Sequence, residues 1–126
     1  MISHEDLLRE AQTLLKLPNR DEVRMRTIVG RAFYAGYHFL RGHPCTADFE
    51  FARDAGMGSH KQFLEWLGGR ANLEIVFAGR LLGKLRSFRV EADYIIGSNL
   101  RPGIDEDAVE TAEQIVEEVL AEYDAE

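Results

Sequence analysis

Apolar residues recur through most of the chain at alternating steps of three and four positions, the spacing that places side chains on one face of an α-helix. The longest stripe consists of Ala78, Leu81, Leu85, Phe88, Ala92 and Ile95. A second stripe consists of Met25, Ile28, Val29, Ala32, Phe33, Gly36, Phe39 and Leu40. Residues 7–15 and 108–123 have the same periodicity, and we find no strand-like alternation. The pattern therefore predicts four main helices, over about 4–17, 20–41, 71–96 and 106–123.

Polar residues mark where three of these helices are expected to begin. Ser3 and Asp6 stand at the spacing of a capping box, and Asn19 with Glu22 repeats that spacing before the second helix. Asp105 is the expected N-cap of the last helix. Within the second helix Gly30 and Gly36 are unfavourable for helix formation, and they would mark a close approach of helices.

Two short helices are predicted between the second and third main helices. One spans 47–55 and carries Phe49 and Phe51. The other spans 60–67, has Ser59 as its expected N-cap, and ends at the pair Gly68-Gly69. The fold class that follows is an all-α, up-and-down bundle of four main helices with one or two short extra helices. We expect residues 1–126 to form a single helical domain.

The charge of the chain is unevenly distributed. The net charge is −7, but 105–126 contains ten acidic residues and no Lys or Arg, so 1–104 carries 15 basic and 12 acidic residues. This distribution argues against a DNA-binding protein that uses its whole surface, and it leaves room for a local cationic site. No apolar run is long enough to span a membrane, no signal peptide is recognisable, and Cys45 has no partner for an internal disulfide. These features predict a cytoplasmic protein.

The candidate chemistry begins with a polar column on the third main helix. Arg86, Arg89 and Asp93 recur at steps of three and four, beside the apolar stripe. Spacing alone allows a surface ion pair between Arg89 and Asp93, which would contribute at most about 0.5 kcal/mol. It equally allows a cationic site for phosphate in which Asp93 orients Arg89.

Further candidates lie on two other helices. Arg31, Tyr34, His38 and Arg41 share the non-core face of the second helix, which could be a solvated face, a dimer surface or a surface that stacks on bases. His60 and Lys61 could bind an anion at a helix N-terminus, or could simply form an exposed first turn. His38, His43 and Cys45 fit no zinc-binding pattern, and no glycine-rich phosphate loop is present, so neither a metal nor a cofactor is predicted.

Three segments together resemble a known family. Arg31–His38, reading R-A-F-Y-A-G-Y-H, resembles the R-A-Y-Y-A-x-F-H segment on the second helix of HEPN-domain proteins. Ser59–Phe63 resembles their short segment that contains Lys and His. Leu85–Tyr94 is similar to their L-x-x-x-R-x-x-A-D-Y segment. The segments occur in the family's order, and the resemblance extends from about Asp21 to Leu120.

The resemblance implies a small helical bundle that forms a homodimer and brings the arginine helices of two protomers together. Many HEPN proteins are metal-independent ribonucleases, often toxins paired with a nucleotidyltransferase-type antitoxin. Their site is an Arg followed, after four to six residues, by a His. Arg89 matches the Arg, whereas Tyr94, Ile95 and Ile96 stand at the positions of the His.

On this resemblance we expect a toxin–antitoxin component with an altered ribonuclease site built on Arg89, Asp93 and Tyr94. The expected substrate-binding residues are Arg31, Tyr34, His38, His60, Lys61 and Arg86. The missing His motivates an alternative, a non-catalytic dimeric module that binds RNA, a nucleotide or a partner protein. A purely structural homodimer is a third interpretation, motivated by the Tyr and Arg residues of the second helix.

Overall fold

The computed structural model describes residues 2–18, 21–53, 56–94 and 100–123, apart from the side chain of Tyr94. Its long helices are α1 (His4–Lys16), α2 (Glu22–Gly42), α4 (Leu73–Tyr94) and α5 (Ile104–Tyr123). A shorter helix, α3 (Ser59–Gly68), and a 3₁₀ turn, η1 (Pro44–Thr46), lie between α2 and α4. These parts of the chain contain no strand. The predicted all-α bundle is therefore confirmed.

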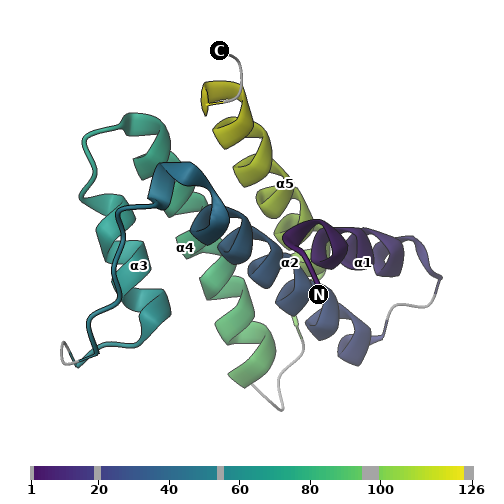
Figure 1. The fold of residues 1–126 in the computed structure, drawn as a ribbon. Helices are drawn as coiled ribbons and strands as arrows, with labels where there is room; N and C mark the ends of the chain where they lie inside the picture. The colour runs from purple at the N-terminus through teal and green to yellow at the C-terminus, as the bar shows by residue number, and fades with distance from the viewer. Residues whose placement is uncertain (1, 19–20, 54–55, 95–99, 124–126) are drawn as a thin grey trace.

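Helix α2 lies at the centre of the bundle and packs against α1, α4 and α5. Helix α4 also packs against α5 on one side and against α3 on the other, so α3 and α5 lie on opposite sides of it (Figure 1). The largest fully buried side chains of the core include Ile28, Phe33, Leu40, Phe63, Leu67, Leu82, Leu85, Ile104 and Ile115. The apolar stripes predicted for α2 and α4 supply four of these side chains, namely Ile28, Phe33, Leu40 and Leu85.

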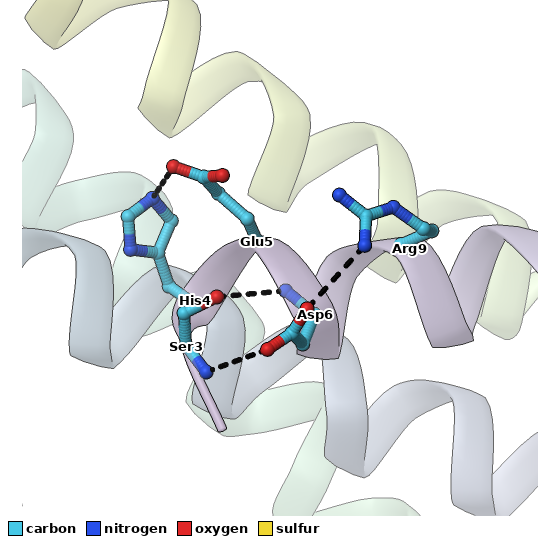
Figure 2. A network of polar contacts seen from close by, with 5 residues as sticks. All are labelled: Ser3, His4, Glu5, Asp6 and Arg9. Carbon is cyan, nitrogen blue, oxygen red and sulfur yellow. Dashed lines mark hydrogen bonds and ion pairs between the residues drawn. The ribbon is translucent and has the colours of Figure 1, made fainter. Parts of the chain in front are cut away.

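The first helix begins as its sequence predicts. The Asp6 backbone N–H donates to the Ser3 hydroxyl at 3.2 Å, and the Ser3 backbone N–H donates to the Asp6 carboxylate at 3.0 Å (Figure 2). Arg9 lies 3.3 Å from the same carboxylate. The reciprocal pair of hydrogen bonds is a capping box, which satisfies two N–H groups that the helix itself cannot pair.

Three other predicted N-caps are wrong. Asp21 caps α2, with its carboxylate accepting from the Arg24 N–H at 2.8 Å, and the predicted Asn19 lies outside the described residues. Gly58 precedes α3, so that Ser59 is already its first helical residue. Helix α5 begins one residue before Asp105, which places this buried carboxylate in the first turn. Ser59 misses the cap by one position and Asp105 by two, so sequence spacing located these helix starts without resolving them to the residue.

The predicted helix over 47–55 is also wrong. The chain forms η1 and then continues without an α-helix through residue 53, and residues 54–55 lie outside the described part. The Gln62 side chain holds this segment by accepting from the Ala52 N–H at 2.9 Å and donating to the Ala52 carbonyl at 2.8 Å. Phe49 anchors the segment in the core beside Phe63, with ring centroids 5.0 Å apart. A side chain of α3 thus provides the pairing that helical hydrogen bonds would have provided.

The two glycines of α2 have different surroundings. A Cβ at Gly36 would lie 3.0 Å from a Leu85 methyl and 3.2 Å from an Ile115 methyl, which confirms the predicted close approach there. A Cβ at Gly30 would meet nothing within 4 Å, so no helix approaches Gly30 closely. The tight packing at Gly36 lets α4 and α5 lie directly against α2, and it brings the polar column of α4 beside the outer face of α2.

Candidate functional site

The polar column of α4 contains the ion pair that its spacing allows. Arg89 Nε lies 3.2 Å from Asp93 Oδ2, and the two side chains are 18% and 36% exposed. The N–H of this buried Nε is not directed at a hydrogen-bond acceptor among the described residues. The contact is therefore an electrostatic pair rather than a hydrogen bond, and the guanidinium keeps donor capacity for another group.

Arg89 also lies against two aromatic rings of α2. Its guanidinium carbon is 5.1 Å from the ring centroid of Phe33 and 5.0 Å from that of Tyr34. At these distances the ring faces attract the cation and reduce the cost of burying it. The contact exists because the packing of α4 on α2 places residue 89 beside residues 33 and 34.

An open hollow of about 460 Å³ lies next to this contact. Its lining consists of Val23, Arg26, Thr27, Gly30, Arg31, Tyr34, Arg89 and Asp93. Two of its arginines have partners elsewhere: Arg31 Nε lies 3.1 Å from Glu10 Oε1 on α1, and Arg26 pairs with Glu22 at 2.8 Å. Arg26 also donates to the Ala92 carbonyl near the end of α4. The hollow is thus lined by three guanidinium groups and one carboxylate.

The first turn of α3 brings His60 to the same aromatic cluster. Its ring centroid lies 5.3 Å from that of Phe33, 6.2 Å from that of Tyr34 and 4.4 Å from that of Tyr37. Burial lowers the pKa of His60, and the positive charges of Arg89, Arg86 and His38 lower it further. The imidazole is therefore held in its neutral form at neutral pH.

His38 completes the group from α2. It is exposed, and its ring stacks on Tyr34 with centroids 5.9 Å apart and lies 5.3 Å from Tyr37. A second open hollow, of about 400 Å³, is lined by Tyr37, His38, Arg41 and Gly42. The guanidinium of Arg41 lies over the Phe49 ring at 4.8 Å, so this arginine helps to anchor the segment that follows α2.

Most of the predicted site residues come together on one face. Arg31, Tyr34, His38, His60, Arg86, Arg89 and Asp93 lie along adjoining surfaces of α2, α3 and α4. Lys61 is exposed and lines neither hollow. The side chain of Tyr94 lies outside the described part of the structure.

The sequence did not single out Arg26 or the contact that Phe33 makes with Arg89. A spacing of four residues links Arg26 to Gly30, Tyr34 and His38. This spacing could have placed Arg26 on the same helix face as the predicted site residues Tyr34 and His38. Phe33 was assigned to the core, and it is fully buried there. Its second role, as a surface for Arg89 and His60, depends on the packing of three helices, which local spacing does not report.

Within the described residues, no group of three or more His, Cys, Asp or Glu residues is placed to hold a metal ion. None of the helices there has the length and apolar character to cross a bilayer. Comparison of the chain with protein-family models, curated proteins and solved structures gives no match. The site is therefore defined by its own geometry, as a cationic and aromatic face that presents Arg86, Arg89, His38 and His60.

Proposed function

We propose that the protein is a HEPN-type component of a toxin–antitoxin pair that acts on RNA through the face centred on Arg89. The observation that carries the proposal is the position of Arg89, stacked on Phe33 and Tyr34 at the edge of an open hollow. Such an arginine offers donors for a phosphodiester while the neighbouring aromatic faces offer stacking surface for bases. The ordered sequence resemblance supports the same assignment.

The charge around Arg89 suits a phosphate ligand. Arg86, one turn before it, is half-buried and has no ion-pair partner among the described residues. Tyr34 and the exposed His38 form a stacked pair, and Arg89 lies against the Tyr34 ring. Arginines interleaved with aromatic rings bind single strands without strong sequence preference, because every base has a face that can stack. We therefore take single-stranded RNA as the ligand.

The proposal includes a homodimer, and a nucleotidyltransferase-type antitoxin as its partner in the cell. Val23 and Val90 are exposed on α2 and α4, and Val23 lines the hollow that Arg89 borders. They supply apolar surface for contact with a second chain beside the site. The molar mass measured by light scattering tests the homodimer, and a monomer at micromolar concentration would contradict it.

The alternative function is binding without cleavage. It is favoured by the residues that follow Arg89, because Tyr94, Ile95 and Ile96 stand where the family's ribonuclease site has a His. A tyrosine, with a pKa near 10 in model peptides, is a poor base at neutral pH. A protein of this kind would bind the same single-stranded RNA through Arg86 and Arg89 and leave it intact.

Both proposed functions, cleavage of RNA and binding without cleavage, depend on Arg89. We therefore expect Arg89→Ala to weaken RNA binding. Affinity for a fluorescent single-stranded RNA, followed by anisotropy, should fall at least tenfold, or about 1.4 kcal/mol. Arg80→Ala is the matched control, because Arg80 is exposed on the same helix and lines neither hollow. Gel analysis of total RNA with the same proteins separates cleavage from binding alone. Equal binding by wild type and Arg89→Ala would contradict the proposed function.

A further inference from the structure

His60 and Arg89 come from different helices and contact the same two aromatic side chains. The Phe33 ring lies 5.1 Å from the Arg89 guanidinium and 5.3 Å from the His60 ring. The Tyr34 ring lies 5.0 Å from that guanidinium and 6.2 Å from the His60 ring. A phosphodiester held by Arg89 would therefore lie near an imidazole that α3 supplies.

The groups that surround His60 favour its neutral form. From α2 it faces Tyr34, Tyr37 and His38, and from α4 it faces Arg86 and Arg89. Burial lowers the pKa of His60, and the cationic groups on both helices oppose its protonation. On α3 itself the next residue is the exposed Lys61, whose charge has the same sign. At neutral pH His60 can thus accept a proton.

A second imidazole, that of His38, lies against the same tyrosine rings. His38 contacts both tyrosines that His60 contacts, at 5.9 Å from Tyr34 and 5.3 Å from Tyr37, and it is exposed to solvent. The two histidines are close enough that a charge on His38 disfavours a charge on His60. An acid–base pair requires one imidazole that accepts a proton and one that donates a proton, and the half-buried His60 and the exposed His38 place two imidazoles against the same tyrosines.

We infer that His60 is the proton acceptor and His38 the proton donor for RNA cleavage at this site, in place of a His after Arg89. This inference rests on the proposed function. The ribose 2′-oxygen attacks the adjacent phosphorus, and its proton passes to His60. The bond between phosphorus and the 5′-oxygen breaks, and that oxygen takes a proton from the His38 imidazolium. Arg89 and Arg86 stabilise the charge on the phosphate, and the product strands end in a 2′,3′-cyclic phosphate and a 5′-hydroxyl.

The test compares His60→Gln and His38→Gln with wild type on a short fluorescent single-stranded RNA. We expect each variant to cleave at least about 100-fold more slowly. Binding of the same RNA with 2′-O-methyl groups, which cannot attack phosphorus, should change less than about twofold. His4→Gln is the matched control, because His4 is also a half-buried histidine packed on an aromatic ring, that of Phe39, with centroids 5.1 Å apart. The His4→Gln variant should cleave the RNA at the wild-type rate.

The pH profile of wild type provides a readout that needs no variant. Cleavage should slow as the pH falls into the acid range, since protonation of His60 removes the base. A wild-type rate that does not fall at any acid pH at which the protein stays folded, or equal cleavage by His60→Gln, would overturn the inference and leave the proposed function standing. Products that carry 5′-phosphates would also overturn it. If wild type binds RNA without cleaving it, the acid–base assignment fails, and if it does not bind RNA at all, the proposed function fails as well.

Discussion

The Arg89 side chain is largely covered by protein, and its neighbours explain how a cation is kept there. Asp93 supplies the opposite charge at 3.2 Å, and Phe33 and Tyr34 supply ring faces at about 5 Å. Removing a charge from water is costly unless such partners replace the lost hydration. A lysine could not occupy this position in the same way, because it lacks the planar group that lies along a ring and presents several donors.

The low pKa of His60 has a consequence for stability. A histidine whose pKa is lower in the folded than in the unfolded chain binds fewer protons when folded. Its contribution to stability is therefore complete above the unfolded value near 6.5 and is lost as the pH falls below it. Lowering the pH from 7.5 to 5.5 should reduce the melting temperature of wild type more than that of His60→Gln.

Thermal unfolding followed by circular dichroism at both pH values measures this difference. The low pKa of the Asp6 carboxylate does not interfere, since it lies below the usual value near 3.8 and outside the pH range used. His4→Gln, which leaves His60 in place, should retain the full wild-type loss. An equal loss in wild type and His60→Gln would show that His60 titrates alike in the folded and unfolded chains.

Among the site residues, the sequence could predict only contacts within one helix. The Arg89–Asp93 pair follows from a spacing of four residues, and the structure contains it. The position of His60 beside Arg89 follows from the packing of α3 against α4 and α2, which joins residues 29 positions apart in the chain. A local sequence pattern does not reveal contacts between residues so far apart in the chain. His60 was predicted as a site residue because of the family resemblance and because it lies at a helix start.

Among the helices, α3 and α4 approach each other most tightly at Gly79. A Cβ at this position would lie 2.8 Å from the Leu67 Cβ, closer than two carbon atoms can come without a shift of the backbone. Gly79→Ala should therefore destabilise the protein by about 1–3 kcal/mol, as overpacking of a core does. Urea unfolding measures the change in the free energy of unfolding.

Gly83→Ala is the matched control on the same helix. A Cβ at Gly83 would meet nothing within 4 Å, so the substitution gains the helix propensity of alanine at no steric cost. It should stabilise the protein by up to about 1 kcal/mol. If the two variants changed stability in the same direction, the close approach of α3 and α4 at Gly79 would be refuted.

The long elements could be predicted because each carries a full apolar stripe. The stripes of α2 and α4 continue over many turns. Most of their residues are buried, Met25 and Phe88 are partly buried, and Ile95 lies outside the described residues. The segment 47–53 could not be predicted, since it is short and its backbone is held by Gln62, a residue of another element. Helix starts were off by one residue at Ser59 and by two at Asp105, because several polar residues adjoin each start and local spacing does not choose among them.

For the molecule as a whole, acidic residues are concentrated on one helix. Helix α5 carries acidic residues and no basic ones, and it packs on the side of α4 opposite α3 (Figure 1). The arginines and histidines of the site lie on α2, α3 and α4. A chain with a net charge of −7 can therefore attract a polyanion at one face while its remaining surface repels it.

Binding of RNA at this face should accordingly depend on salt, though only moderately. If Arg86 and Arg89 neutralise about two phosphates, the affinity for a single strand should fall about sevenfold from about 50 to about 200 mM salt. Anisotropy titrations with an uncleavable 2′-O-methyl RNA measure the slope. The double variant Arg86→Ala/Arg89→Ala should lose most of it. An affinity that does not change with salt in wild type would contradict contact with phosphates.

The three segments singled out in the sequence lie on α2, α3 and α4, and the structure packs these helices together. What the sequence could not supply at this scale is the identity of the ligand. The hollow beside Arg89 is wide and open, and its shape suits many phosphate-bearing molecules. The choice of RNA rests on arginines placed among aromatic rings together with the family resemblance.

Helix α3 packs chiefly against α4, whereas α2, α4 and α5 pack against one another. Such a peripheral helix can detach as a cooperative unit at a lower free-energy cost than global unfolding, and its amides then exchange with solvent first. Detachment would carry His60 away and leave Arg89 on Phe33 and Tyr34. Warming would thus remove the proposed proton acceptor before it removes the phosphate-binding arginine, so that catalysis would be lost at a temperature where binding persists.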